Sequence, residues 1–282
     1  MCKGRPMATP SDTAGDSPPA VADLNRFTAL RVMGTQALSP HMRRVRFAGS
    51  HLEAFATEAH LHIGLLIPPP GASRTEWLTL ESGGKARVRQ VDCKPVNRKY
   101  TIRAIDSVAG RIDIDFVLHD DGGPGGSWAA AAQPGDMVGI LGPGGRGLAP
   151  ADWHLIAGDE TALPAIGRMI EAMATDAHGQ IVIEIADAAE QQALQPPPGV
   201  ALQWLHRDGA AAGTTELLLN AIRAISLPPN DIRRFAWVGA EFTAAQAIRD
   251  YLCKQAGIAR GDQLVVPYWR RGRAGATDGS SV

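Results

Sequence analysis

The sequence contains few cysteines, and their scarcity and spacing exclude several classes of protein. Only three occur in 282 residues, namely Cys2, Cys93 and Cys253, and they form no C-x-x-C pair. An odd number of scattered cysteines argues against a disulfide framework, a structural zinc site and an iron–sulfur cluster. Free thiols are typical of the reducing cytoplasm, so we expect a cytoplasmic protein.

Net charge and long apolar runs are also lacking. The formal net charge is −1 at pH 7, whereas a nucleic-acid-binding domain usually carries a clear basic excess. We therefore expect no nucleic-acid partner. No uncharged apolar run approaches the ~18 residues that a membrane-spanning helix needs, so we expect no membrane insertion. We also expect a monomer.

Glycine and proline are abundant instead, with 31 and 20 residues, and this disfavours an all-helical protein. Part of the excess lies in residues 1–22, which are rich in Pro, Ser, Asp and small residues and lack the apolar core of a secretory signal. Such a composition cannot bury enough surface to offset the entropy of ordering. We expect disorder in this arm and in the tail, residues 273–282.

The ordered chain changes character near residue 150. Before it, short β-branched or alternating segments separated by turn residues predict an antiparallel β-barrel over residues 23–150. After it, buried strands alternate with segments of helical periodicity, which predicts a parallel-sheet α/β domain over residues 151–272. The predicted barrel strands include RFTALRVMGTQAL, HMRRVRFAG, LHIGLLIPPPG, RKYTIRAID, RIDIDFVLHD and DMVGILGP. The predicted α/β strands are WHLIAG, QIVIEIAD, VALQWLHR and RFAWVGA.

Two glycine-containing segments are candidates for a phosphate site. GPGGRG, residues 142–147, matches G-x-G-x-x-G, but a strand follows it where a dinucleotide fingerprint requires a helix. We interpret it as an interdomain turn. AGDETALPAI is the better candidate, because Asp159 or Thr161 can cap a helix with Pro164 in its first turn. A helix that begins at the carboxyl end of the first parallel strand offers free N–H groups to a pyrophosphate.

A third segment combines residues suited to a flat, phosphorylated ligand. In RKYTIR, residues 98, 100 and 102 share one face of a strand and residues 99, 101 and 103 share the other. An arginine fork suits a pyrophosphate, a tyrosine ring can stack on a heterocycle, and a threonine hydroxyl can bond a ring nitrogen. Farther on, a strand leads into DDGGPGGSWAAAA, whose backbone N–H groups can surround an anion.

Together these segments resemble the siderophore-interacting protein family, flavin-dependent ferric-siderophore reductases related in architecture to ferredoxin–NADP reductases. The resemblance covers nearly all of the ordered chain. It rests on RKYTIR, DFVLH with GGPGGSWA, QPGDMVGILGP, AGDETALPAIGRMIE, WLHR, WVGAE and PYWRRG, in the family's order. It implies an N-terminal antiparallel Greek-key β-barrel that binds FAD, followed by a C-terminal parallel-sheet α/β domain that binds NAD(P)H.

The resemblance also implies a flavin site on the barrel. Arg98 is expected at the pyrophosphate, and Tyr100 and Thr101 at the isoalloxazine ring. Val117 and His119 match the strand that lines the other side of the flavin. The matching positions of the phosphate-binding loop are Gly123, Pro124, Gly125, Ser127 and Trp128.

A nicotinamide-dinucleotide site is implied at the α/β domain. The family's dinucleotide turn matches Gly158, Asp159, Glu160, Thr161 and Ala162. Arg207 is expected to meet an adenosine 2′-phosphate, which favours NADPH, with NADH as the alternative donor. Gly239, Ala240 and Glu241 are expected beside the nicotinamide. Tyr268 and Trp269 are expected to close over the flavin or to line the substrate cleft.

The implied substrate is a ferric siderophore, and two positions depart from the family pattern. Gly64 stands where a Lys or Arg is usual, and many members have GPRG where this chain has GPGG, so that Arg146 is displaced by two positions. Both usual basic residues are candidates for holding an anionic siderophore. The departures indicate a different or less anionic ferric chelate, and Arg146, Arg270 and Arg271 are candidates to compensate.

The implied mechanism needs no catalytic acid, base or nucleophile from the protein. NADPH delivers a hydride to the flavin, and single electrons then pass to chelated Fe(III), which is released as Fe(II). His60 and His62, with His51 and Glu58 nearby, are better explained as strand histidines than as a metal site. Two alternatives stay open. One is a flavoprotein reductase with another acceptor, such as free flavin, a quinone or a protein. The other is a non-redox siderophore-binding protein.

Overall fold

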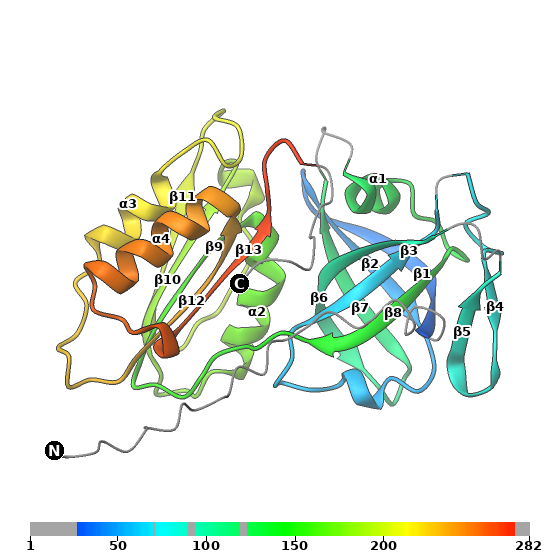
Figure 1. Cartoon of the computed structure of the whole chain (residues 1–282), viewed down its shortest axis with the longest axis horizontal. Coiled ribbons are helices and arrows are strands. Elements are labelled where there is room, and N and C mark those ends of the chain that lie inside the picture. The colour runs from blue at the N-terminus through cyan, green and yellow to red at the C-terminus, as the bar shows by residue number, and fades with distance from the viewer. Residues whose placement is uncertain (1–26, 70, 90–93, 119–122, 274–282) are drawn as a thin grey trace, which may run out of the picture.

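Two domains lie side by side in the computed structural model (Figure 1). The structure describes residues 27–69, 71–89, 94–118 and 123–273. The expected disordered arm lies outside these ranges, as does the expected disordered tail apart from its first residue.

The N-terminal domain is a closed six-stranded antiparallel barrel. Its strands run in the order β2-β7-β6-β3-β8-β1, and pairing of β1 with β2 closes it. They are β1 (Phe27–Ser39), β2 (Met42–Ala48), β3 (His62–Ile67), β6 (Val96–Asp106), β7 (Arg111–Val117) and β8 (Met137–Gly144). A short hairpin of β4 (Leu78–Leu80) and β5 (Lys85–Val88) extends β1 at one edge. The predicted barrel is confirmed, although the sequence did not indicate this hairpin.

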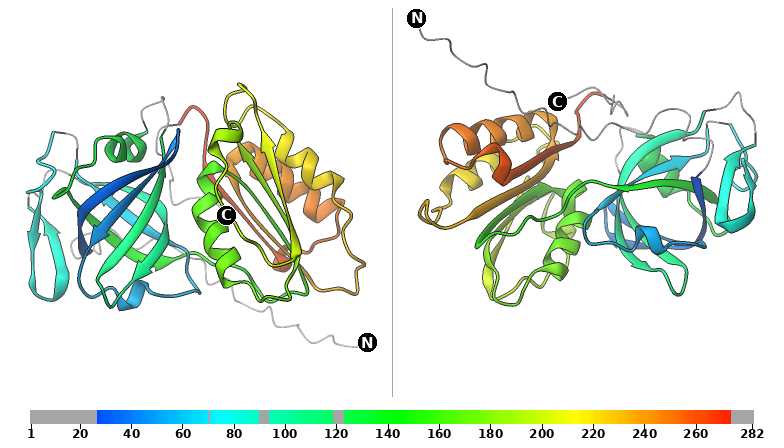
Figure 2. Two further views of the ribbon diagram at one scale, coloured as in Figure 1. Left: turned by 180° about the vertical axis from the view of Figure 1, so that it is seen from behind. Right: turned by 60° about the horizontal axis from the view of Figure 1, so that its bottom comes forward.

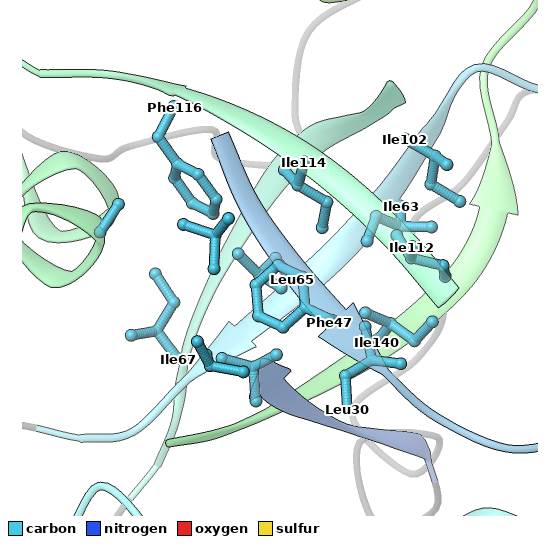
Figure 3. Close-up of a cluster of buried hydrophobic side chains, with 14 of the residues drawn as sticks. Leu30, Phe47, Ile63, Leu65, Ile67, Ile102, Ile112, Ile114, Phe116 and Ile140 are labelled. Carbon is cyan, nitrogen blue, oxygen red and sulfur yellow. The ribbon is translucent and has the colours of Figure 1, made fainter. Parts of the chain in front are cut away.

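Apolar and polar side chains alternate along the barrel strands, so that apolar ones point into the core and polar ones lie on the outer face. Figure 3 shows the inward cluster, which is built from every strand of the closed barrel. In β7, Ile112, Ile114 and Phe116 are completely buried in it. The intervening Asp113 and Asp115 lie on the other face and receive paired hydrogen bonds of 2.6–2.9 Å from arginines of β2. Charged pairs placed directly across two strands stabilise their register.

The C-terminal domain is a parallel five-stranded sheet with helices on both faces. Its strand order is β11-β10-β9-β12-β13, and every pairing is parallel. The strands are β9 (Trp153–Asp159), β10 (His178–Ile185), β11 (Gly199–His206), β12 (Arg234–Glu241) and β13 (Gln263–Trp269). The helices are α2 (Leu163–Ala172), α3 (Leu217–Ala224) and α4 (Phe242–Lys254). The parallel-sheet domain is confirmed, with β13 as an added edge strand.

The helices also set which face of the sheet meets the barrel. α3 and α4 pack on the face that is turned away, whereas α2 lies between the sheet and the barrel (Figures 1 and 2). In an open parallel sheet, ligands bind outside the carboxyl ends of the strands, where the strand order reverses. Here the order reverses at β9, because β10 lies on one side of it and β12 on the other.

Polar contacts join the two domains along α2. The Arg168 guanidinium donates to the backbone oxygen of Thr57 at 2.7 Å and to that of Leu61 at 3.4 Å, both in the barrel domain. Arg103 of β6 pairs with Glu171 of α2 through bonds of 3.0 and 2.6 Å. These contacts tie the α2 face of the sheet to a barrel loop and to β6.

A buried carboxylate makes another interdomain contact. Glu190 accepts hydrogen bonds from Ser39 Oγ at 2.5 Å, His41 N at 2.9 Å and His41 Nδ1 at 2.7 Å. Its side chain belongs to the α/β domain, whereas Ser39 and His41 form the turn between β1 and β2 of the barrel.

Among the described residues, no helix is long and apolar enough to cross a membrane.

Candidate functional site

Three aromatic side chains from separate barrel elements form a row. The Tyr100 ring of β6 lies 4.5 Å from the Phe116 ring of β7, centroid to centroid. Phe116 lies 5.9 Å from Trp128, which belongs to the helix α1 (Pro124–Ala130). The structure thus brings together Tyr100 and Trp128, which the sequence singled out. Phe116, which was not predicted as a site residue, lies between them.

A glycine lets α1 approach this row closely. A Cβ atom at position 125 would lie 2.8 Å from Tyr100 Cζ and nearer still to the Tyr100 hydroxyl. The helix begins after Gly123 with Pro124 in its first turn, and no side chain caps its N-terminus. The Ser127 N–H bonds the Gly123 carbonyl oxygen within this turn. Gly125 therefore presents its backbone, with no side chain in between, to the tyrosine.

Two buried N–H groups at this site have no hydrogen-bond partner among the described residues. They are Arg98 Nε and the Trp128 indole nitrogen. The Arg98 guanidinium bonds the Asn97 carbonyl oxygen at 2.6 Å, and burial lowers the pKa of Arg98. Buried donors in folded proteins are usually satisfied, so two orphaned ones beside an aromatic row indicate a missing acceptor. A flat, phosphorylated group such as FAD fits this donor set.

The remaining residues of the predicted flavin site lie at the edges of this region. Val117 ends β7, and the next residue, Leu118, donates its N–H to the His41 carbonyl oxygen at 2.8 Å. Thr101 follows Tyr100 on β6 and is buried. His119 lies outside the described residues.

Paired glycines shape the carboxyl edge of the parallel sheet. Gly158 of β9 is the register partner of Gly239 of β12. A Cβ atom at position 158 would lie 2.6 Å from the Gly239 oxygen and would overlap the Ala162 methyl group. One at position 239 would lie 3.2 Å from the Tyr268 ring. The lack of a side chain at position 158 leaves room for the turn after β9, and its lack at position 239 leaves room for the Tyr268 ring.

Asp159, the last residue of β9, joins several elements at this edge. One carboxylate oxygen accepts from Thr161 N at 3.0 Å and from Thr161 Oγ1 at 2.5 Å. The other accepts from Glu241 N at 3.0 Å and from the Trp269 indole at 2.8 Å. Burial and the neighbouring Glu160 raise the pKa of Asp159 to about 7, against the opposing effect of its donors. Asp159 thus caps the short 3₁₀ turn Glu160–Ala162, whereas α2, the helix whose cap was predicted, begins at Leu163 without a side-chain cap.

Arg207 lies in a buried ion-pair cluster beside that turn. It pairs with Glu160 through bonds of 2.9 and 2.5 Å and reaches Glu184 at 3.5 Å. Glu184 also accepts a hydrogen bond of 3.0 Å from Thr215. The structure places Arg207 at the predicted edge, but with its charge engaged by two carboxylates of the protein itself. The sequence did not indicate Glu184 as a member of the site.

Glu241 and Trp269 complete this edge. Glu241 caps α4 by accepting from Thr243 N at 2.5 Å, and its other oxygen accepts from Arg271 N at 3.2 Å. Ala240 precedes it and is buried in the core of the sheet. The Trp269 ring lies against Gly213, where a Cβ atom would be 3.0 Å from the indole. Trp269 is therefore held on the α/β side of the molecule.

One side-chain interaction connects the two predicted cofactor regions. Burial raises the pKa of Tyr268 in β13, and an interaction with the side chain of Thr101 in β6 opposes this rise. The Tyr268 ring also packs edge-on against Trp237, with centroids 6.0 Å apart. The residue after the predicted flavin-stacking tyrosine thus touches the carboxyl edge of the sheet.

The predicted substrate arginines are all exposed. Arg146 follows β8, whereas Arg270 and Arg271 follow β13, and the Arg270 guanidinium lies 4.5 Å over the Phe242 ring. At position 64 a Cβ atom would lie 2.9 Å from Asn97 Oδ1, so a basic side chain would crowd Asn97. Lys99 is the cross-strand register partner of Gly64.

Other grooves and histidines do not coincide with the predicted site. A groove of about 460 Å³ lies between the barrel and α2, and its lining includes Arg103, Arg168 and Glu171 but none of the predicted cofactor or substrate residues. The ring of His60 contacts the Gly145 oxygen at 2.9 Å. Within the described parts of the chain, no three His, Cys, Asp or Glu side chains are grouped to hold a metal ion.

Comparison with known families agrees with this division of the chain. Residues 31–147 match the model of the siderophore-interacting FAD-binding domain. Residues 151–272 match the model of the siderophore-interacting protein. Together the two matches cover almost every described residue.

Relatives of known name or structure cover most of the chain. Ferric vibriobactin reductase ViuB of Vibrio cholerae is 35% identical over 84% of this chain and 86% of its own. The NADPH-dependent ferric-chelate reductase of Escherichia coli is 28% identical over 77% and 82%. The structure of a siderophore utilization protein from T. fusca has a TM-score of 0.77 at 40% identity, covering 89% of this chain and 95% of that one. A cytochrome P450 reductase from Amycolatopsis, 15% identical with a TM-score of 0.59, shares the fold.

Proposed function

Because the chain belongs to the siderophore-interacting protein family, we propose that it is an FAD-dependent reductase of ferric siderophores. Its electron donor is a reduced nicotinamide dinucleotide, NADPH or NADH. Its product is Fe(II), which oxygen-rich chelators bind much more weakly than Fe(III). The scattered cysteines support a cytoplasmic site of action.

The observation that carries this proposal is the contact between two regions with different chemistry. The barrel offers an aromatic row and orphaned donors, whereas the sheet offers a glycine-shaped edge. The interaction between the Tyr268 and Thr101 side chains joins them. A bound flavin and a nicotinamide must meet for hydride transfer, and this interaction supports their meeting between β6 and β13.

The residues of the chain supply binding and orientation. Arg98 and the backbone of the segment that starts α1 hold the anionic part of the flavin, while Tyr100 faces its ring. Gly158 and Gly239 let a dinucleotide approach the backbone at the sheet edge. FAD, when bound, supplies the conversion from two-electron to one-electron chemistry. The exposed Arg146, Arg270 and Arg271 attract an anionic ferric chelate.

The experiment that tests this function begins with the absorbance spectrum of the purified protein. We expect flavin bands, directly or after reconstitution with FAD. A preparation that stays colourless after reconstitution would contradict a flavoprotein and support a non-redox siderophore-binding protein.

The second step is anaerobic turnover of NADPH and NADH with a panel of ferric chelates, with a ferrous chelator to trap the product. We expect Fe(II) formation that requires both the nicotinamide donor and the flavoprotein. Rapid flavin reduction without Fe(II) from any chelate would instead indicate another acceptor, such as free flavin, a quinone or a protein.

A further inference from the structure

An acidic and a basic residue, of the types that distinguish the adenosine ribose of NADH from that of NADPH, occur together at this sheet edge. In parallel dinucleotide-binding sheets, an acidic residue after the second strand bonds the ribose 2′-hydroxyl of NADH. An arginine nearby accommodates the 2′-phosphate of NADPH. Here Glu184 lies near the end of β10, the second strand of the sheet, and Arg207 directly follows β11. The chain therefore carries residues of both types.

Arg207 and Glu184 are hydrogen bonded to each other, but Glu160 binds Arg207 more closely than Glu184 does. Glu160, in the turn after β9, makes two bonds to Arg207, of 2.9 and 2.5 Å. Glu184 makes one longer contact of 3.5 Å and is also bonded to Thr215. The side chains of Arg207, Glu160 and Glu184 are only 4%, 12% and 8% exposed.

The charge balance of the cluster opposes a phosphate. Two carboxylates, those of Glu160 and Glu184, are bonded to one guanidinium. A phosphate brings about −2 charge at neutral pH, so it can bind Arg207 only after a carboxylate moves away. Arg207 also keeps a buried Nε with no partner among the described residues. The guanidinium is thus incompletely satisfied by the pairing it has.

From this geometry we infer that Glu160 competes with the adenosine 2′-phosphate for Arg207, and so sets the preference between NADPH and NADH. This inference rests on the proposed use of a nicotinamide dinucleotide. Glu160 is the competitor because its bidentate pair must open, whereas Glu184 is held in place by Thr215. A ribose diol carries no charge, so NADH needs no such exchange. The wild-type protein therefore distinguishes weakly between the two donors.

The test measures binding of adenosine probes to the FAD-loaded protein by calorimetry, without turnover. The probes are 2′,5′-ADP and 5′-ADP, which differ only in the 2′-phosphate. In the wild type we expect dissociation constants that agree within about threefold. In Glu160→Gln, which keeps the size of the side chain but not its charge, we expect 2′,5′-ADP to bind about tenfold more tightly relative to 5′-ADP. NADP⁺ and NAD⁺ should show the same change in ratio.

Two further variants identify Arg207 as the group released. Adding Arg207→Gln to Glu160→Gln should return the ratio to the wild-type value. Glu171→Gln, which breaks the interdomain pair with Arg103, is the matched control and should leave the ratio unchanged.

A wild-type protein that already prefers 2′,5′-ADP by more than tenfold would overturn the inference without any variant. So would an unchanged ratio in a folded Glu160→Gln protein, or failure of both probes to bind. Neither of the first two results would affect the proposed reductase function, which fails only if neither NADPH nor NADH reduces the flavin.

Discussion

The two candidate cofactor regions differ in how far their polar groups are already satisfied. At the barrel, Arg98 Nε and the Trp128 indole are buried donors without partners among the described residues. At the sheet edge the opposite holds for the carboxylates. Asp159 accepts four hydrogen bonds, and Glu160 and Glu184 share Arg207. The barrel region thus has two buried donors without an acceptor among the described residues, whereas the sheet edge has one, Arg207 Nε, and its carboxylates are bonded within the protein.

This difference corresponds to two modes of cofactor use. A prosthetic group that stays bound can complete a site that is unsatisfied without it, because the site is rarely empty. A dinucleotide that binds and leaves in each cycle needs a site that is stable in both states, and internal hydrogen bonds provide that stability. The comparison therefore predicts tight binding at the barrel and exchangeable binding at the sheet.

The largest expected effect is loss of flavin from Gly125→Ala. The new Cβ would overlap Tyr100, so either the ring or α1 must move away. Overpacking of this kind costs about 1–3 kcal/mol, and at the flavin site we expect FAD affinity to fall at least about tenfold. Flavin fluorescence after dialysis measures the loss.

Gly34→Ala is the matched control for this change. Gly34 also lies in the barrel domain, but a Cβ atom there would have no neighbour within 4 Å. We expect its FAD content to equal that of the wild type. Full FAD retention in a folded Gly125→Ala protein would show that α1 is not part of the flavin site. The barrel region would then not be the tight binding site that the comparison predicts.

The architecture could be predicted because its signals are local. Strand alternation in RIDIDFV and the buried run WHLIAG each lie within a few residues, so the barrel and the parallel sheet were both foreseen. The hairpin strands Leu78–Leu80 and Lys85–Val88 are too short to show a period, and they were missed. The edge strand β13 was likewise not indicated by pattern.

The site could be predicted as a set of residues but not as a set of contacts. RKYTIR and AGDET point to ligand chemistry because residue types in short motifs are visible in sequence. The pairing of Arg207 with Glu160 depends on β9, β10 and β11 lying side by side, which brings together residues 47 positions apart. The sequence therefore suggests that the positive charge of Arg207 is free to bind a phosphate, whereas in the structure Glu160 and Glu184 are bonded to it.

The next effect concerns stability, through Asp159→Asn. An amide cannot accept from all four donors of Asp159, and each buried donor left without a partner costs about 1–3 kcal/mol. The pKa of Asp159 is raised from 3.8 to about 7 in the folded state, so folding takes up a proton between these values. Wild-type stability from this group is complete below pH 4 and is lost as pH rises toward 7.

Urea unfolding of both proteins at pH 5 and pH 8 measures this dependence. We expect the deficit of Asp159→Asn to shrink as the pH rises. A deficit that instead grows with pH would mean that the four donors hold the carboxyl pKa below its ordinary value. The hydrogen bonds at the sheet edge would then stabilise the Asp159 carboxylate more strongly than its burial destabilises it.

A smaller effect is expected at the contact between the two domains, from Glu190→Gln. The amide loses part of the bonding to Ser39 and His41, which costs about 1–2 kcal/mol. FAD content should not change, because the side-chain hydrogen bonds of Glu190 among the described residues go to Ser39 and His41, which are not predicted flavin residues. Reduction of the bound flavin by NADPH should slow a few-fold in stopped-flow measurements, since the sheet edge is less firmly positioned. The exposed Asp231→Asn serves as control, and equal slowing there would rule out this role.

The smallest effect is expected outside both regions, at the exposed Arg146. If it attracts the ferric chelate, Arg146→Gln should raise KM for an anionic chelate about two- to fivefold with kcat unchanged, because exposed charges interact weakly and act mainly on encounter. The increase should disappear with a neutral chelate and at high salt, where the Debye length shortens. Arg233→Gln, just before the amino end of β12 and therefore at the opposite end of this strand from the candidate site, is the control. An equal change in that variant would mean that net charge, and not position 146, guides the substrate between the two cofactor regions.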